Sequence, residues 1–182
     1  MSKFGTKAIH AGTEPDSATG AIMTPVYQTS TYVQNAPGEH KGYEYSRTLN
    51  PTRHALEKNL AALENGNYGL TFSSGLAAMD ALLKIFKPGD EIISSNDLYG
   101  GSYRLFTKVF TDLGLKFHFV EMDDLTEVES LINLNTKMIW IETPTNPMMN
   151  IIDIKAVSNL AKKYNILSAV DNTFSSPYLQ NP

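Results

Sequence analysis

Short apolar runs alternate with amphipathic stretches from residue 68 onward. Apolar runs bounded by polar or turn-forming residues predict β-strands at residues 68–73, 91–95, 116–120, 137–142 and 166–170. Stretches in which apolar residues recur every three or four positions predict helices at residues 76–86, 104–113, 125–132 and 154–164. Strands that alternate with helices favour a largely parallel sheet with helices on both faces. The pattern therefore predicts a doubly wound α/β domain.

The first 50 residues show neither helical nor strand periodicity and are rich in Gly, Pro, Ser, Thr and Tyr. A structureless stretch of this length is improbable inside a compact domain, so we expect an arm that lies across another surface, such as a partner subunit. A helix is expected to begin at Asn50 and Pro51, as cap and first helical residue, and to end at Asn65 and Gly66. We therefore divide the chain into an arm, residues 1–50, and a partial α/β domain, residues 51–182.

The last apolar run, residues 166–170, is expected to be a buried parallel strand. Residues 172–182 are predicted to form a loop, and no helix follows to close the crossover. We therefore expect the chain to be the N-terminal portion of a longer protein.

Composition and charge argue against several classes of protein. Of the 182 residues, 42% are hydrophobic and 19% are charged, as in ordinary globular proteins. The formal charge of -4 provides no basic surface for nucleic acid or an anionic membrane. There is no Cys and the four His residues are scattered, so we expect neither a disulfide nor a metal site. No apolar run approaches the ~20 residues of a membrane span and the N-terminus lacks the apolar core of a signal peptide, so we expect a cytoplasmic protein.

Asp171 directly follows the last predicted strand. In open α/β sheets, ligands bind beyond the carboxyl ends of the strands, and a fixed negative charge there favours a cationic ligand. The alternative is that Asp171 caps the following turn or pairs with a structural Arg. Ser74, Gly75 and Leu76 lie between a predicted strand and a helix, where small residues and a helix N-terminus suit a phosphate. Their alternative is an ordinary tight connection.

Two further loops bring candidate groups to the same edge of the predicted sheet. Tyr99 offers a ring on which a flat heteroaromatic ligand can stack, or it covers the edge of the core. Glu142 and Asn146 bring a carboxylate and an amide, although the two prolines in their loop can also simply fix a turn.

The arm and one predicted helix carry candidate cationic groups. Tyr45 and Arg47 suit a phosphate, or they form an interface contact. Arg104 is expected at the start of a helix, where a cation opposes the helix dipole, so we expect another group to hold it. A phosphate site, an aromatic face and an acid together match a phosphorylated, protonatable aromatic ring, and pyridoxal phosphate has all three parts.

Several short motifs resemble, in their order and spacing, the pyridoxal-phosphate-dependent enzymes of cysteine and methionine metabolism, the group of cystathionine γ-lyase, γ-synthase and methionine γ-lyase. The resemblance extends from about residue 6 to Pro182 and implies the large domain of a fold type I pyridoxal-phosphate-dependent transferase. The motifs are Tyr45-Ser-Arg47, Asn50-Pro-Thr52, Ser74-Gly-Leu76, Tyr99-Gly-Gly101, Glu142-Thr-Pro-Thr-Asn-Pro147 and Val170-Asp-Asn-Thr-Phe174.

The resemblance implies a role for each candidate residue around the cofactor ring. Asp171 would keep the pyridine nitrogen protonated, with Thr173 supporting the ring beside it. Tyr99 would stack on the ring and assist proton transfer. Asn146 would contact the phenolic oxygen of the ring or the region of the substrate carboxylate.

The resemblance also implies how the phosphate is held. Gly75 and Leu76, next to Ser74, would bind it through backbone amides, while Tyr45 and Arg47 would reach the phosphate of a neighbouring subunit. The positions of Glu142 and Arg104 match residues that shape the site. An oligomer, a tetramer built from dimers, is implied as well.

The activity implied is that of a transsulfuration enzyme in methionine biosynthesis and cysteine metabolism. It is elimination or replacement at the γ-carbon of cystathionine or an O-acylhomoserine, by a cystathionine γ-lyase or γ-synthase. Gly101 and Arg104 favour these enzymes over methionine γ-lyases, which usually carry a Cys just after the Tyr-Gly pair. Methionine γ-lyase and O-acetylhomoserine sulfhydrylase are the alternatives among enzymes.

The Schiff-base lysine of the family follows the Asp-Asn-Thr-Phe segment within a Ser-x-Thr-Lys sequence, and this chain ends before it. The nearest lysines, Lys155, Lys162 and Lys163, lie upstream. We therefore expect the chain alone to be inactive as a catalyst. A non-catalytic assembly or cofactor-binding fragment is the alternative from another class.

Overall fold

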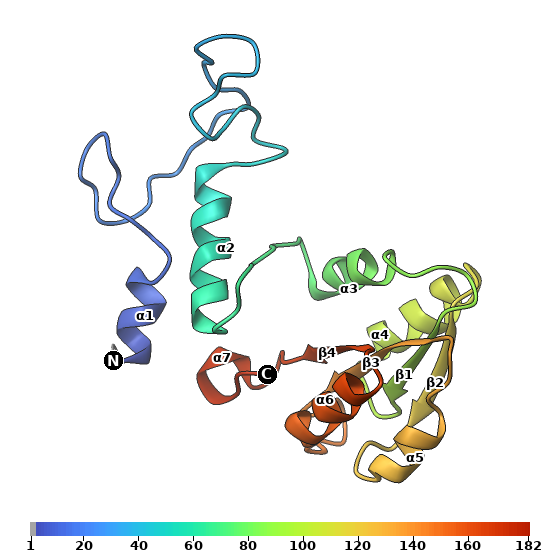
Figure 1. Cartoon of the computed structure of the whole chain (residues 1–182). Helices are drawn as coiled ribbons and strands as arrows, with labels where there is room; N and C mark the ends of the chain where they lie inside the picture. Colours follow the sequence, from blue (N-terminus) through green and yellow to red (C-terminus); the bar gives the residue numbers. More distant parts are fainter. Residues whose placement is uncertain (1–2) are drawn as a thin grey trace. The chain divides into compact units, whose positions relative to one another are not determined.

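The computed structural model describes residues 3–182 and contains two compact units, one ending at Thr71 and the other running from Phe72 to Pro182. The N-terminal unit contains the helices α1 (Phe4–His10) and α2 (Pro51–Leu63), and the C-terminal unit contains all the strands of the described residues (Figure 1). The division of the chain into an arm and a domain at residue 50 stays a prediction.

A four-stranded parallel sheet forms the centre of the C-terminal unit. Its strands lie in the order β2-β1-β3-β4. They are β1 (Glu91–Ser95), β2 (Lys116–Val120), β3 (Thr136–Glu142) and β4 (Leu167–Asp171). Because all the strands are parallel, their carboxyl ends meet at one edge of the sheet, where Glu142 of β3 pairs in register with Asp171 of β4.

Helices cover both faces of this sheet, as the alternating pattern predicts. They are α3 (Gly75–Leu83), α4 (Gly100–Leu105), which continues as the π-helix η1 (Phe106–Phe110), α5 (Leu125–Ser130) and α6 (Ile154–Lys163). The short α7 (Ser176–Leu179) follows β4 and belongs to neither core. The side chains of Ser74, Asp124 and Asp153 cap α3, α5 and α6, each by accepting a backbone N–H of the first turn.

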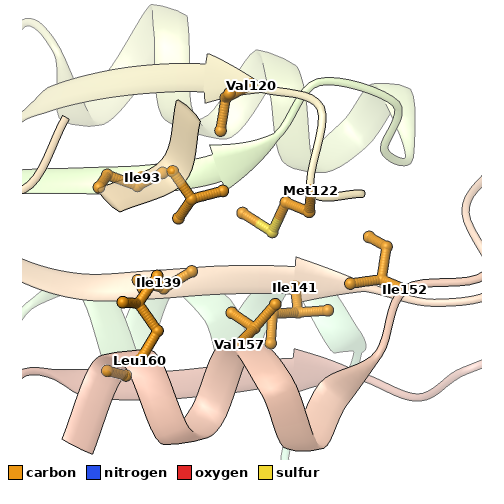
Figure 2. Close-up of a cluster of buried hydrophobic side chains, with 10 residues drawn as sticks. Ile93, Val120, Met122, Ile139, Ile141, Ile152, Val157 and Leu160 are labelled. Carbon is orange, nitrogen blue, oxygen red and sulfur yellow. The ribbon is translucent and has the colours of Figure 1, made fainter. Parts of the chain in front are cut away.

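Alternate residues of the central strands pack into two separate cores. On one face, Val157 and Leu160 of α6 lie beside Ile139 and Ile141 of β3, as Figure 2 shows. On the other face, Trp140 packs with residues of α3 and η1, among them Met79, Leu83 and Phe106. Both faces of β1 and of most of β3 are therefore buried, which is why these two strands show no alternation of buried and exposed residues.

The N-terminal unit depends on polar contacts around α2. Asn50 is the N-cap of α2 and accepts a hydrogen bond from the amide of Thr52 at 2.9 Å. The amide of Tyr27 donates to the hydroxyl of Thr52, also at 2.9 Å. The side-chain amide of Asn59 donates to the carbonyls of Lys7 and Ala11, which fixes α1 against α2. The predicted start of the second helix is therefore confirmed, whereas α1 lies in a stretch for which no helix was expected.

Three further expectations about elements are wrong. Residues 68–73 form no strand, because no strand of the described residues lies beside them to pair with their backbone. β4 is not buried: only β3 pairs with it, and its first residue, Leu167, is 51% exposed. The loop expected after Asp171 contains α7.

Arg104 also differs from its prediction. It lies in the last turn of α4, because the helix begins at Gly100 rather than at Arg104. Because α4 continues directly into η1, Arg104 lies inside the helical stretch from Gly100 to Phe110 and outside its first turn, so the dipole gives no reason to expect a partner. Among residues 3–182, no helix is both long enough and apolar enough to cross a membrane.

Candidate functional site

A cavity of about 360 Å³ lies at the carboxyl edge of the sheet, within the C-terminal unit. It brings together groups from the N-terminus of α3, the loop after β1, the end of β3 with its loop, and the end of β4. Its lining residues are Ser74, Gly75, Leu76, Met79, Tyr99, Glu142, Pro144, Asn146, Asp171, Thr173 and Phe174. The predicted candidates of this unit therefore share one cavity, with the exception of Arg104.

The N-terminus of α3 forms one wall. Ser74 has an extended backbone and caps the helix, its hydroxyl accepting the amide of Ala77 at 3.1 Å. The amides of Gly75 and Leu76 find no acceptor among residues 3–182. A Cβ added at Gly75 would meet no atom within 4 Å, so the space over this glycine is open. Free amides, open space and the positive end of a helix dipole together suit an anion.

Asp171 ends β4 and is half-buried. One oxygen of its carboxylate, Oδ1, accepts both the amide of Thr173 at 3.1 Å and the hydroxyl of Thr173 at 2.5 Å. The other oxygen, Oδ2, accepts no hydrogen bond within residues 3–182. Thr173 therefore fixes the orientation of the carboxylate and leaves one oxygen available to a donor in the cavity.

Tyr99 is the N-cap residue of α4, and its side chain is 44% exposed. A Cβ added at Gly101 would collide with the ring of Tyr99. Gly101 therefore allows the ring to lie flat over the start of α4. The sequence indicates a ring at this edge, but the role of Gly101 in seating it was missed, because the requirement depends on the direction of a neighbouring side chain.

Glu142 ends β3 and is only 4% exposed. Its two carboxylate oxygens accept the amide of Tyr99 at 3.0 and 2.9 Å, and Oε1 also accepts the amide of Asn146 at 3.1 Å. Burial raises the pKa of Glu142, and the nearby charges of Asp171 and Asp97 raise it further against these backbone hydrogen bonds. Glu142 thus shapes the cavity chiefly by binding the backbone amides of two loops, the loop after β1 and the loop after β3.

Asn146 lies in the loop after β3 and is half-buried. Its side-chain amide makes no hydrogen bond within the described residues, so it is available to a ligand. Asp97 organises the rest of this loop, accepting the hydroxyl of Thr145 and the amide of Met148. Sequence reasoning missed Asp97, although it follows the predicted strand at residues 91–95 as Asp171 follows the one at residues 166–170, which was a usable signal.

Other candidates are not brought into the cavity. Tyr45 and Arg47 belong to the N-terminal unit, where the guanidinium carbon of Arg47 lies 5.0 Å from the centre of the Tyr45 ring. Arg104 is exposed and does not line the cavity. The roles of these residues stay predictions.

A larger cavity, of about 760 Å³, lies at the opposite edge of the sheet, near the start of β3 and β4. None of the predicted site residues lines it. In open α/β sheets the carboxyl edge is the usual place for a ligand, so the smaller cavity is the better candidate site.

The groups in the smaller cavity fit pyridoxal phosphate. Free amides at a helix N-terminus suit its phosphate, a half-exposed tyrosine ring suits its aromatic face, and an oriented carboxylate with one free oxygen suits a protonated ring nitrogen. Three apolar lining residues were not predicted: Met79, Pro144 and Phe174. Pro144 and Phe174 lie within the motifs given above, but only the polar and aromatic-stacking residues of those motifs were considered as candidates.

Comparisons with known proteins point to one family. The family model described as Cys/Met metabolism PLP-dependent enzyme matches residues 5–182. A probable cystathionine gamma-synthase of Herpetosiphon aurantiacus is 52% identical over 179 residues, which are 98% of this chain and 56% of that protein. A cystathionine beta-lyase of Coxiella burnetii is 47% identical over 182 residues, which are 100% of this chain and 47% of that protein.

A solved structure is similar in the same way. The crystal structure of cystathionine gamma-lyase from Lactobacillus plantarum, complexed with L-serine, matches with a TM-score of 0.96 and 47% identity, over 100% of this chain and 47% of that one. The predicted fold class, the large domain of a fold type I pyridoxal-phosphate-dependent transferase, is confirmed by this match. The chain spans about half the length of the relatives it matches.

Proposed function

The chain belongs to the Cys/Met metabolism PLP-dependent enzymes, and we propose that it supplies the cofactor-binding part of a transsulfuration enzyme. Pyridoxal phosphate is the cofactor of this family. The proposed reaction is elimination or replacement at the γ-carbon of cystathionine or an O-acylhomoserine, of the γ-lyase or γ-synthase type. One observation carries the proposal: a single cavity gathers an anion site, an aromatic ring and an oriented carboxylate from three separate segments of the chain.

The phosphate end of the cofactor is assigned to α3. The amides of Gly75 and Leu76 donate to the phosphate, and Ser74 keeps the start of the helix in place by capping it. The absence of a side chain at Gly75 lets the anion approach the backbone. Tyr45 and Arg47 are proposed to add a phenol and a guanidinium to the phosphate site of a neighbouring subunit.

The ring end is assigned to β4. Asp171 holds a proton on the pyridine nitrogen through its free oxygen Oδ2, while Thr173 keeps the other oxygen occupied. When bound, pyridoxal phosphate supplies an electron sink for negative charge at the α-carbon of the substrate, and a protonated ring nitrogen strengthens that sink. An ionised Asp171 is therefore the group on which the chemistry depends most.

Tyr99 and Asn146 complete the proposed site. The ring of Tyr99 covers one face of the cofactor ring and excludes water from it, and its hydroxyl assists proton transfer. The side-chain amide of Asn146 donates to the phenolic oxygen of the cofactor or lies close to the substrate carboxylate. Glu142 and Arg104 are proposed to shape the site without holding the cofactor directly.

The substrate, the assembly and the location of the whole protein are parts of the same proposal. Relatives are named gamma-synthase, gamma-lyase and beta-lyase, and all three names refer to cystathionine. An amino-acid substrate is proposed on this basis. A homotetramer and a cytoplasmic location are proposed from the resemblance to the family alone. Separate assays with cystathionine, with O-acylhomoserine plus cysteine, and with methionine, on the protein as isolated from its source, test the reaction. Turnover of methionine alone would contradict the proposed substrates.

Cofactor binding by the 182-residue chain tests the site itself. Pyridoxal phosphate and pyridoxal, which lacks the phosphate, are titrated separately by isothermal calorimetry. We expect pyridoxal phosphate to bind at least about tenfold more tightly, because charge-assisted hydrogen bonds to the amides of α3 are lost with pyridoxal.

Two variants locate the two ends of the ligand. Gly75→Glu places a carboxylate in the open space over the helix N-terminus and is expected to weaken binding of pyridoxal phosphate on the order of 100-fold, with little effect on pyridoxal. Asp171→Asn is expected to weaken both ligands. Asp123→Asn, an exposed acid after β2, is the matched control and should bind as the wild type does. Equal affinities for the two ligands in the wild type would contradict the proposed phosphate site.

A further inference from the structure

The loops after β1 and β3 are linked by two carboxylates that reach across to one another's loop. Asp97, after β1, accepts the hydroxyl of Thr145 and, at 3.1 Å, the amide of Met148, both in the loop after β3. Glu142, at the end of β3, accepts the amide of Tyr99 in the loop after β1. We call Asp97 and Glu142 the crossed carboxylates. Asp97 thus fixes the loop after β3, and Glu142 fixes the loop after β1.

The bonds of Glu142 reach two of the proposed site residues through their backbones. Its carboxylate accepts the amide of Tyr99 at 3.0 and 2.9 Å and the amide of Asn146 at 3.1 Å. Both of these residues line the same cavity. A movement of the Glu142 carboxylate would therefore displace the aromatic ring and the amide together.

Stability alone does not account for a carboxylate at this position. Glu142 is 4% exposed, its donors within residues 3–182 are all backbone amides, and two further acids, Asp171 and Asp97, lie near it. Burying a charge without a cationic partner costs free energy, which hydrogen bonds offset only in part. A group held at such a cost is better explained by what it positions.

We propose that Glu142, with Asp97 as its counterpart, is a positioning residue that sets Tyr99 and Asn146 as one unit at the rim of the cavity. The hydrogen bonds that link the two loops need no ligand. Only the role given to this link, placing Tyr99 and Asn146 for cofactor binding, rests on the proposed function. Glutamine is a poor replacement for the carboxylate. Its single oxygen, at the position of Oε1, would be a neutral acceptor shared by both amides, and its NH₂ group would face the backbone N–H of Tyr99.

The test uses backbone NMR of the ligand-free 182-residue chain. In Glu142→Gln, hydrogen exchange of the Tyr99 and Asn146 amides is expected to become about tenfold faster for both, because the charged acceptor that they share becomes a neutral one. Glu121→Gln, an exposed acid after β2, is the matched control and should change neither amide. Faster exchange at one of the two amides only, or at neither, overturns the proposal.

A pH titration of the wild type supplies a readout that a merely structural role would not give. The carboxylates of Asp171 and Asp97 are the charged groups that face Glu142, from β4 and from the loop after β1. The amide protons of Tyr99 and Asn146 are expected to titrate with one shared midpoint, above the ordinary 4.5 of a glutamate. Two different midpoints would overturn the proposal, and this test remains decisive if Glu142→Gln fails to fold.

Binding of pyridoxal phosphate is measured last, so that a failure of the proposed function can be told apart from a failure of the positioning role of Glu142. Glu142→Gln is expected to weaken the binding of pyridoxal phosphate about tenfold if Tyr99 and Asn146 both shift. If the wild type binds no pyridoxal phosphate while the two amides still respond together, the proposed function fails and the link between the loops stands. If the wild type and Glu142→Gln bind pyridoxal phosphate equally well, although both amides exchange faster in the variant, the positioning role is overturned.

Discussion

Glu91 and Glu142 are both buried glutamates of the same sheet, but they lie at opposite ends of it and are held in opposite ways. Glu91 begins β1 and is 6% exposed, and Glu142 ends β3 and is 4% exposed. Glu91 accepts hydrogen bonds from side chains: Asn133 at 2.8 Å, Lys116 at 3.4 Å, and a ring nitrogen of His118 at 2.8 Å. Glu142 accepts only backbone amides among the described residues.

The two environments shift the two acids in opposite directions. The hydrogen bonds from Asn133 and His118, with Lys116 nearby, lower the pKa of Glu91 from 4.5 to about 2. Burial, with Asp171 and Asp97 nearby, raises the pKa of Glu142. Ionised Glu91 thus stabilises the fold at the amino edge of the sheet, whereas ionisation of Glu142 at the carboxyl edge lowers stability. Such a group is typical of a functional edge.

Truncation of Glu91 should give the largest loss of stability. Glu91→Ala leaves Asn133 and His118 without their acceptor at a partly buried position, and we expect a loss of about 2–3 kcal/mol in the free energy of unfolding. Urea denaturation of the ligand-free chain at neutral pH measures it. A loss as small as that of an exposed acid, tested with Glu121→Ala, would contradict the stabilising role.

Substitution of Glu142 should have a smaller effect on stability. Glu142→Gln loses hydrogen bonds to two amides but also removes a buried charge next to Asp171 and Asp97, so we expect the free energy of unfolding to change by less than about 1 kcal/mol. The same urea titration measures it. A destabilisation equal to that of Glu91→Ala would remove the distinction between the two edges.

The pH dependence of stability should have opposite signs at the two edges. The folded pKa of Glu91 is lowered, so its contribution is complete above 4.5 and is lost as pH falls toward about 2. The folded pKa of Glu142 is raised, so its ionisation costs stability as pH rises above 4.5. The stability difference between the wild type and Glu91→Gln should therefore shrink on acidification, whereas Glu142→Gln should gain on the wild type as pH rises. Parallel pH profiles for the two variants would contradict this account.

The smallest effect is expected at Lys116. Its side chain is 63% exposed and its ammonium lies 3.4 Å from Glu91, so the ion pair is screened by solvent. Lys116→Met should lower the free energy of unfolding by no more than about 0.5 kcal/mol, an effect that added salt removes. A larger, salt-independent loss would show that the amino edge depends on this charge and not on Asn133 and His118.

Much of the fold follows from the local pattern of the sequence. The bounds of β1 and β2 and the parallel character of the sheet were predicted correctly, because short runs bounded by turn-forming residues alternate with helical stretches. The exposure of β4 and the lack of a strand at residues 68–73 could not be predicted in this way, because pairing depends on a neighbouring strand and not on the run itself.

The candidate site was predictable to the extent that each motif is local. Gly75 and Asp171 stand at strand ends or helix starts, where topology alone places them at one edge of the sheet. Asp97 was missed because its partners lie in a loop about fifty residues further along the chain. The resemblance to the family was confirmed by the match over residues 5–182. The roles of Tyr45, Arg47 and Arg104 stay predictions.

The most direct test of the account is the protonation state of the ring nitrogen of the bound cofactor. Pyridoxal phosphate labelled with ¹⁵N at that nitrogen is bound to the chain and observed by NMR as pH is raised. The account predicts that the nitrogen stays protonated in the wild type well above the pH at which the free ligand loses its proton, and that Asp171→Asn abolishes this difference. The same protonation state in the wild type and in Asp171→Asn would contradict the claim that the carboxyl edge of the sheet is a pyridoxal phosphate site centred on Asp171.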